Sequence, residues 1–224
     1  MLSSIPIYSP EDRYYPEISR IYREAFADEE RVPFDSLLEW VNSGLEGMVG
    51  LLGAFIDAGQ VVAMGSAAFF PNYWMGYLPY LAVRQDVRGR GYGRQTVEFL
   101  FDWIMQRAGE MTGENPCLVF WDVRDPDDSP DEAERTIRQR RIKFYRQLGS
   151  EVLPIAYTYP PVAKGQPYVR SRLMAFKYGQ GKAVITRQEA IDLAYLAIIR
   201  IGHNPETSTY WKDALQSIDR HWPS

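Results

Sequence analysis

The stretch Tyr77–Ile104, YLPYLAVRQDVRGRGYGRQTVEFLFDWI, decides how this chain folds. It opens with an apolar run over 77–83, continues through a basic, glycine-rich turn over 84–94, and ends in a segment of helical periodicity. The apolar positions of that last segment are Val97, Leu100, Phe101 and Ile104. A strand, a turn of bare amides and a helix present N–H groups and the positive end of a helix dipole to an anion. The sequence therefore predicts a phosphate-bearing ligand at Arg88–Arg94.

The composition of the chain is typical of a soluble globular protein with one domain, or with one domain and an appendage. Of its 224 residues, 46% are hydrophobic and 24% are charged. The net charge of −4 argues against general nucleic-acid binding, which usually needs a basic surface. No apolar run could span a bilayer and no signal-peptide pattern opens the chain, so we expect a cytoplasmic protein without a membrane partner. The single cysteine, Cys117, is expected to be a buried core thiol.

Apolar periodicity and turn signals predict a mixed α/β protein. Strand patterns occupy residues 4–8, 48–56, 61–70, 77–83, 117–123, 152–159 and 168–178. Helical patterns occupy residues 16–26, 35–41, the segment from the glycine-rich turn to a cap at Gly109, 129–148 with Ser129 as cap, 186–199 and 205–222. Since most strands can pair through short hairpins, we expect an α/β (α+β) fold with a mixed, mostly antiparallel central sheet flanked by helices. We predict one domain over 1–180 and a C-terminal helical appendage over 183–224, packed on that domain or at a homodimer interface.

The glycine-rich turn does not fit two common phosphate-binding motifs. A P-loop needs GxxxxGK[ST], but the Gly181-Lys182 pair has Phe176 in place of the first glycine. A Rossmann fingerprint needs GxGxxG, but the two frames in this turn end on Arg94 and Thr96. The sequence also lacks GxSxG, which argues against a hydrolase of the Ser-His-Asp type, and its Cys and His lack metal-ligand spacing, so no metal is expected.

The motif that remains is R-x-x-G-x-G, within residues 88–93. It follows an apolar strand ending in Leu-Ala-Val, and it resembles the acyl-CoA-binding motif [QR]-x-x-G-x-[GA] of the GNAT N-acetyltransferase superfamily. A second segment, KFYRQLG at 143–149, resembles the FYxxxG segment that follows the fifth strand in that superfamily. The element order over residues 4–178 also agrees. The resemblance implies a GNAT-like fold and an enzyme that transfers the acetyl group of acetyl-CoA to a primary amine by direct attack.

The chemistry of the turn suits coenzyme A. The amides of Gly89–Gly93 can approach a pyrophosphate closely because glycine lacks a side chain and tolerates positive φ. Three arginines add positive charge, although a solvated helix start is the alternative for each side chain. The resemblance adds the backbone of residues 81–83, which would bind the pantetheine arm and the thioester carbonyl. The expected cofactor-binding residues are Leu81, Ala82, Val83, Arg88, Gly89, Arg90, Gly91, Tyr92, Gly93 and Arg94.

Acetyl transfer to an amine needs a group that protonates the leaving thiolate and a base that accepts the amine proton. By resemblance, Tyr145 lies beside the CoA sulfur and is the expected general acid; a core tyrosine is the alternative. Family members often use a glutamate on the strand before the motif, but 77–83 contains no carboxylate. Glu29, Glu30 and Asp122 are the candidate bases, and solvent is a further alternative.

The acceptor amine stays open between a small amine, an amino acid, an antibiotic and a protein lysine. Aromatic residues expected to line its site are Tyr73, Trp74, Tyr157 and Tyr159. The segment Pro160–Pro167 is a candidate lid, and the acidic loop Arg124–Asp131 either favours a cationic acceptor or is simply solvated. A CoA-binding sensor or interaction module without catalysis is the alternative function, because the strand carboxylate is missing.

Overall fold

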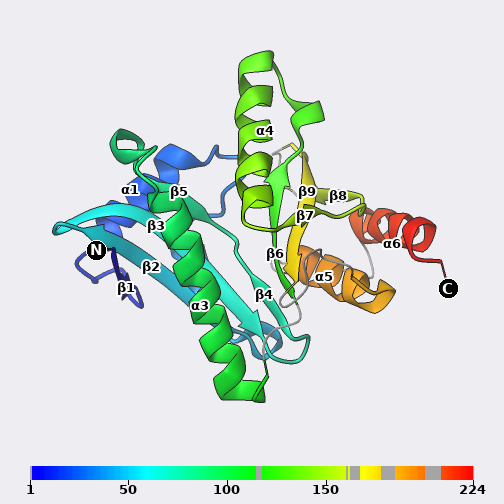
Figure 1. Cartoon of the computed structure of the whole chain (residues 1–224), viewed down its shortest axis with the longest axis horizontal. Helices are drawn as coiled ribbons and strands as arrows, with labels where there is room; N and C mark the ends of the chain where they lie inside the picture. The colour runs from blue at the N-terminus through cyan, green and yellow to red at the C-terminus, as the bar shows by residue number, and fades with distance from the viewer. Residues whose placement is uncertain are drawn as a thin grey trace. The chain divides into compact units, whose positions relative to one another are not determined.

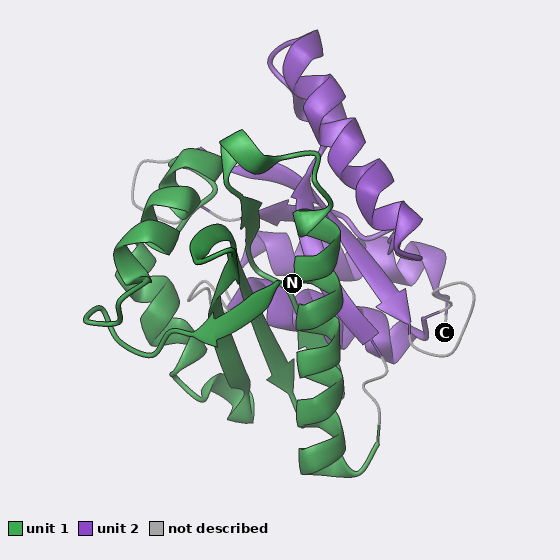
Figure 2. Ribbon diagram, turned by 60° about the vertical axis from the view of Figure 1, so that its left-hand side comes forward, with its two compact units in different colours: residues 1–116 green, residues 117–224 purple. Residues whose placement is uncertain are grey.

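The computed structural model describes residues 2–114, 118–159, 161, 167–177, 185–199 and 208–223. It has a mixed α/β fold with mostly antiparallel strand pairing, as expected from the sequence (Figure 1). The chain forms two compact units, residues 1–116 and 117–224, which are described separately below (Figure 2). Cys117 lies outside the described residues, so its predicted burial stays a prediction. None of the helices within the described ranges is long and apolar enough to cross a membrane.

Unit 1 is built on a meander of antiparallel strands. Its elements are β1 (Ser3–Pro6), α1 (Tyr15–Ala25), α2 (Phe34–Val41), β2 (Val49–Asp57), β3 (Gln60–Phe70), β4 (Met75–Tyr77), β5 (Leu81–Val83) and α3 (Tyr92–Thr112). The strands β1, β2, β3 and β4 pair in chain order, and β5 also pairs with β3. The central strands β2 and β3 are almost wholly buried, since helices cover both faces of this meander.

The two faces of β2 carry different helices, as its period of two requires (Figure 2). Leu52, Ala54 and Ile56 share a core cluster with residues of α1 and α2. Phe55 points the other way and its ring lies 5.3 Å from the ring of Phe99 on α3. Gly65 of β3 allows α3 to approach closely, because a Cβ there would lie 2.9 Å from Leu100 Cδ1. This contact fixes the helix whose first turn carries the glycine-rich motif.

Unit 2 is built around β9. Its elements are β6 (Leu118–Arg124), α4 (Glu132–Gln147), β7 (Glu151–Val152), β8 (Tyr157–Tyr159), β9 (Val169–Lys177), α5 (Arg187–Ile199) and α6 (Thr209–His221). Strand β9 pairs antiparallel with β6, β7 and β8. Trp121 of β6 packs against Tyr145 of α4, with ring centroids 4.7 Å apart. On the opposite face, the Tyr157 hydroxyl donates to the Ala197 carbonyl of α5 at 3.2 Å.

The described parts of the predicted appendage, α5 and α6, contact the strands of unit 2. Besides the bond to Ala197, the Ala156 N–H donates to Ser217 Oγ of α6 at 2.8 Å. These bonds join both helices to β8 and to the residue that precedes it. The division into a domain over 1–180 and an appendage over 183–224 stays a prediction, as does a homodimer interface.

Several element boundaries differ from the sequence-based expectations. The single strand expected over 77–83 is two strands, β4 and β5, and the one expected over 152–159 is β7 and β8. Helix α3 runs past Gly109 to Thr112, and Gly113 (φ 76°) is its left-handed cap. Helix α4 begins later than expected, because Asp131 rather than Ser129 accepts the capping hydrogen bond, from the Glu134 N–H at 2.8 Å.

Candidate functional site

The interruption between β4 and β5 is a β-bulge. Against β3, Tyr77 lies opposite Ala68 and Leu81 lies opposite Gly65. Between these two pairs β3 contributes two residues, whereas the other strand contributes the three residues of 78–80. One extra residue on one strand is the definition of a bulge, and Pro79 suits this position because it has no N–H to leave unpaired.

Ser66 satisfies the backbone after the bulge. Its N–H donates to the Tyr80 carbonyl at 2.8 Å, and its side-chain Oγ accepts from the Tyr80 N–H at 3.2 Å. Ser66 is fully buried, so water cannot replace it. The backbone of Arg84 also faces β3, since its N–H donates to the Val62 carbonyl at 2.9 Å. Ala82 lies two residues from both Tyr80 and Arg84, so its N–H and C=O groups point to β3 as well.

The backbone of Leu81 and Val83 consequently faces away from β3, because successive residues of a strand point their N–H and C=O groups to opposite sides. No strand in the described part of unit 1 pairs with this second edge of β5. The Val83 carbonyl accepts a hydrogen bond from Arg88 Nε at 3.2 Å, and a carbonyl has room for a second donor. Unit 1 thus offers an edge of backbone donors and acceptors directly before the glycine-rich turn.

The Ser66→Ala chain is expected to unfold more easily and to bind coenzyme A more weakly. Without the hydroxyl, the Tyr80 N–H is buried without its partner, which costs about 1–3 kcal/mol. Relaxation of the bulge would also turn the β5 edge. Urea unfolding measures the first effect and titration calorimetry with coenzyme A the second. Ser36→Ala, at an exposed position of α2, is the control. Unchanged stability and affinity in Ser66→Ala would show that the hydroxyl does not hold the bulge.

The turn after β5 leads into a helix start without a cap. Gly89 and Gly91 have φ of 79° and 84°, in the left-handed region that favours glycine. The first intrahelical bond of α3 runs from the Gln95 N–H to the Gly91 carbonyl at 3.2 Å, so the N–H groups of residues 92–94 have no partner within the helix. No side chain among the described residues caps this end, and the first turn holds no acidic residue. Bare amides at the positive end of a 21-residue helix form an anion-binding arrangement.

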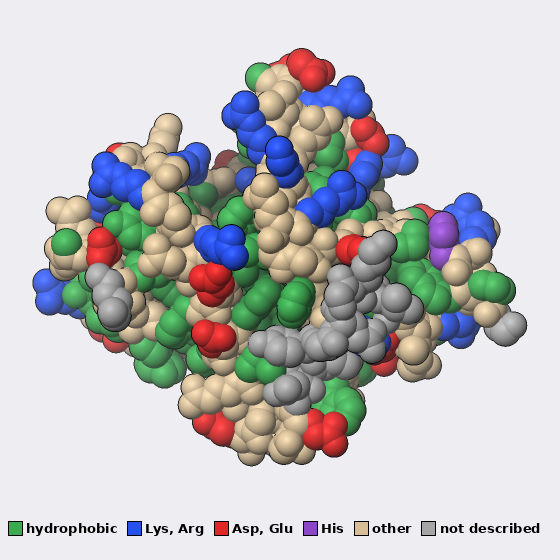
Figure 3. Space-filling model, in the orientation of Figure 1, with side chains coloured by type: hydrophobic (Ala, Val, Ile, Leu, Met, Phe, Trp, Pro, Cys, Tyr) green, Lys and Arg blue, Asp and Glu red, His purple; other side chains and the backbone are tan. Residues whose placement is uncertain are grey.

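The predicted arginines have different roles. Arg94 pairs with Glu98 at 2.8 Å on the exposed face of α3, and Arg88 bonds to β5 as described above. Arg90 is exposed, and no described residue forms a hydrogen bond or ion pair with it. Arginine side chains gather over this turn before α3 (Figure 3). Arg90 is therefore the side chain best placed to meet an anion without first breaking a contact.

Contacts that the sequence did not predict anchor this turn. The Tyr92 hydroxyl donates to Asp57 Oδ2 at 2.7 Å, which ties the start of α3 to the end of β2 and lowers the pKa of the Asp57 carboxyl. Arg84 bonds to Asp86 at 2.7 Å and to the Val61 carbonyl at 2.9 Å. A tyrosine or an arginine in such a turn carries no sequence signal for its distant partner.

The acidic turn that holds two candidate bases lies beside the bulge strand. The Tyr80 hydroxyl donates to the Glu30 carbonyl at 3.1 Å and accepts from the Val32 N–H at 3.4 Å. Glu30 Oε2 accepts from the Ala27 N–H at 3.4 Å, and Glu29 is its neighbour in the same turn. The fold of unit 1 therefore places the turn with Glu29 and Glu30 beside Tyr80, the residue that precedes Leu81.

The other two predicted catalytic residues, Tyr145 and Asp122, lie together in unit 2. Tyr145 is 9% exposed, and burial raises the pKa of its phenol to about 12; Arg141 lowers this pKa and Asp122 raises it. The phenol is thus protonated at neutral pH and can donate. Because a thiol has a pKa of about 8.5, full proton transfer from so weak an acid is uphill, and hydrogen-bond donation to a thiolate is favoured.

The predicted acceptor residues fall into two pairs. Tyr73 and Trp74 lie in the turn between β3 and β4, where the Tyr73 hydroxyl donates to Glu46 Oε2 at 3.3 Å. Tyr157 and Tyr159 are buried in β8, and the Tyr157 hydroxyl is bound to α5. Of the predicted lid over 160–167, only residues 161 and 167 are described, so the lid stays a prediction.

Arginines bind the acidic loop 124–131. Arg172 forms ion pairs with Asp125 at 2.8 Å and Asp127 at 2.6 Å, and the buried Arg138 donates to the Asp125 and Asp128 carbonyls at 2.9 and 3.1 Å. Burial by itself would raise the pKa of Asp125, but the hydrogen bonds from Arg172 and from the Asp127 N–H bring it below its usual value. These pairs weaken the interpretation of the loop as a site for a cationic acceptor.

Comparisons with known proteins support the interpretation of the motif. Residues 15–125 match the model of the family described as "Acetyltransferase (GNAT) family". A search of curated proteins finds no match.

The chain is also similar to solved structures. One is a protein assigned to the GNAT family from Bacteroides thetaiotaomicron, with 20% identity, a TM-score of 0.66, and coverage of 90% of this chain and 99% of that one. Another is yncA from Salmonella typhimurium with its cofactor acetyl-CoA, with 16% identity, a TM-score of 0.52, and coverage of 80% and 95%. A third is Naa50 from Arabidopsis thaliana in complex with a CoA-peptide bisubstrate analogue, with 14% identity, a TM-score of 0.54, and coverage of 79% and 99%. At these identities the likeness shows the fold alone.

Proposed function

Since the chain belongs to the acetyltransferase (GNAT) family, whose model matches residues 15–125, we propose that it transfers the acetyl group of acetyl-CoA to a primary amine. One observation carries the proposal: the open edge of β5 leads directly into the uncapped, glycine-rich start of α3. A ligand with a pyrophosphate at one end and amides along its arm matches this order of groups. Coenzyme A has that form.

In the proposed complex, the pyrophosphate binds the amides at the start of α3. The N–H groups of 92–94 lack helical partners, and Gly89 and Gly91 have no side chain that could cover them. Arg90 would contact a phosphate, with Arg88 and Arg94 as further cations. The pantetheine arm and the thioester carbonyl would pair with the backbone of Leu81 and Val83.

The reaction would be a direct attack of the neutral amine on the thioester carbonyl. A C–N bond forms, the C–S bond breaks, and the amine proton passes to a base. We propose that Tyr145 donates to the thiolate; its raised pKa of about 12 supports this role because it keeps the phenol protonated. Glu29, Glu30, Asp122 and solvent remain the candidate bases, and the bond between Tyr80 and Glu30 favours the acidic turn.

The acceptor is proposed only as a primary amine, of a small molecule or of a protein. Tyr73, Trp74, Tyr157 and Tyr159 remain the proposed lining of its site. Tyr157 would contribute its ring rather than its hydroxyl, since the hydroxyl is bound to Ala197. The second candidate function, a CoA-binding sensor, is favoured by the absence of a carboxylate from residues 77–83.

Release of free coenzyme A separates the two functions. We expect acetyl-CoA to raise the melting temperature of the chain, because a ligand that binds only the folded state stabilises it. We also expect release of free thiol when an amine is added from a panel of a polyamine, an amino acid, an aminoglycoside and a lysine peptide. Stabilisation without release from any amine would favour the sensor. No stabilisation by acetyl-CoA would contradict both functions.

A further inference from the structure

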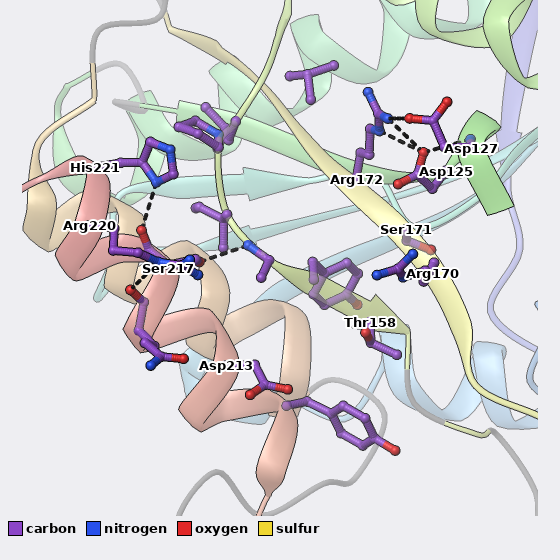
Figure 4. Close-up of a pocket in the computed structure, with 18 residues that line it drawn as sticks. Asp125, Asp127, Thr158, Arg170, Ser171, Arg172, Asp213, Ser217, Arg220 and His221 are labelled. Carbon is purple, nitrogen blue, oxygen red and sulfur yellow. Dashed lines mark hydrogen bonds and ion pairs between the residues drawn. The ribbon is translucent and has the colours of Figure 1, made fainter.

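A cavity of about 710 Å³ lies within unit 2, and Tyr157 is the one residue of its lining that also has a role in the proposed acetyl transfer (Figure 4). One wall consists of β8, β9 and the acidic loop, and the other is the helix α6. Apolar residues between β7 and β8, among them Leu153 and Ile155, complete the lining. The walls also carry polar and charged groups of both signs: Asp125, Asp127, Thr158, Arg170, Arg172, Asp213, Gln216, Arg220 and His221. Such a lining suits a small polar ligand rather than an apolar one.

The outer edge of β8 presents one free pair of backbone groups. The Arg170 carbonyl accepts from the Asp125 N–H at 2.9 Å, so the backbone of Arg170 faces β6. Its neighbours in β9 therefore bond to Tyr157 and Tyr159, their partners in the register. It follows that the N–H and C=O of Thr158 point away from β9, towards the side where the cavity opens.

Helix α6 covers only part of this edge. Ala156 also points away from β9, and its N–H is bound by Ser217 Oγ at 2.8 Å. Thr158 lies two residues further along, and its outer backbone groups have no hydrogen-bond partner among the described residues. A donor and an acceptor on one strand residue form the pattern that pairs with the amide of an added strand.

Two charged side chains of the lining, Arg170 and Asp213, have no hydrogen-bond or ion-pair partner among the described residues. Arg172 is bound to two aspartates, but Arg170 forms no side-chain hydrogen bond or ion pair with a described residue and lies directly opposite Thr158 in the register. Across the cavity, Asp213 is exposed on α6 and likewise forms no such bond within the described part of the chain. Figure 4 shows Arg170 and Thr158 on the strand wall and Asp213 on the helix wall.

We propose that this cavity binds a short peptide of dipeptide size with free termini. Its amide would pair with the Thr158 backbone, its carboxylate with Arg170, and its ammonium group with Asp213. A phosphate-rich ligand fits less well, because the three aspartates of the lining offset the charge of its three arginines. Binding at this site needs no acetyl-CoA, so it can be tested independently of the proposed enzyme activity.

Calorimetry with L-alanyl-L-alanine and the full chain, without acetyl-CoA, tests the site. We expect binding at millimolar concentration or better, and a loss of about tenfold for the N-acetylated and for the C-terminally amidated dipeptide. Asp213→Asn should remove the preference for the free amine, and Arg170→Met the preference for the free carboxylate. Each variant should also bind the parent dipeptide about tenfold more weakly.

Asp219→Asn is the matched control, because Asp219 lies on the same helix, pairs with Arg187 and does not line the cavity. It should bind all three dipeptides like the unaltered chain. Thermal unfolding confirms that each variant is folded. The site would be disproved if L-alanyl-L-alanine does not bind. It would also be disproved if the two blocked dipeptides bind as tightly as L-alanyl-L-alanine and the two cavity variants bind L-alanyl-L-alanine as tightly as the unaltered chain.

Discussion

Gly91→Val should bind coenzyme A about 30- to 100-fold more weakly than the unaltered chain, a loss of ~2–3 kcal/mol. Gly91 has φ of 84°, a conformation that costs an L-residue roughly 1–2 kcal/mol and a β-branched residue more. A valine would therefore pull residue 91 out of the left-handed region and turn the N–H groups of 92–94 away from the pyrophosphate. Steric clash is not the cause, because a Cβ at Gly91 would meet only Gln95 Nε2, at 3.7 Å.

Gly113→Val is the matched control for this prediction. Gly113 ends the same helix, has φ of 76°, and would place a Cβ with nothing within 4 Å. Both variants should lose a similar amount of stability in urea unfolding, since both strain a left-handed residue. Only Gly91→Val should lose affinity in calorimetric titration with coenzyme A. Equal losses of affinity in the two variants would show that the start of α3 is not the binding site.

Tyr145→Phe should lower kcat by roughly 100-fold and leave the Kd for coenzyme A unchanged. The variant keeps the ring that packs against Trp121 but removes the only proton that the side chain can donate. The pKa of about 12 means that the phenol stays protonated through the neutral range. Deprotonation of Tyr145 should therefore not lower kcat below pH 10. Steady-state kinetics across this pH range, in the same assay of free thiol, measures both effects.

The same pKa shift predicts how stability depends on pH. The folded pKa of Tyr145 lies above the ordinary value of 10, so the folded chain holds this proton more tightly than the unfolded chain. The part of the free energy of unfolding that depends on this proton is fully present below pH 10 and is lost as pH rises to about 12. The Tyr145→Phe chain should lack this part of the alkaline loss.

Tyr22→Phe is the control for the kinetic effect. Tyr22 is also buried, and its hydroxyl donates to the Val32 carbonyl at 3.0 Å. Its loss should cost about 1 kcal/mol of stability and leave kcat intact. If Tyr145→Phe behaves in the same way, Tyr145 is a core tyrosine and the donor to the thiolate is another group.

The sequence by itself determined the features that depend on neighbouring residues. Gly89 and Gly91 predicted a turn with positive φ, and the helical spacing from Val97 to Ile104 predicted α3. The mixed α/β fold followed from alternating strand and helix patterns, and the order of the two motifs indicated the acetyltransferase family. These signals are local, because turn chemistry and amphipathic periodicity act within a few residues.

Only the tertiary structure decided which distant groups meet. Ser66 holds Tyr80 across the bulge, the Tyr80 hydroxyl brings the turn of Glu29 and Glu30 to the same strand, and Arg172 binds the acidic loop. Each contact joins residues far apart in the chain, and its existence depends on strand register. A shift of one residue turns every side chain of a strand to its other face, so no pattern of neighbours specifies such pairs. The bulge that opens the edge of β5 is therefore a property of the folded meander.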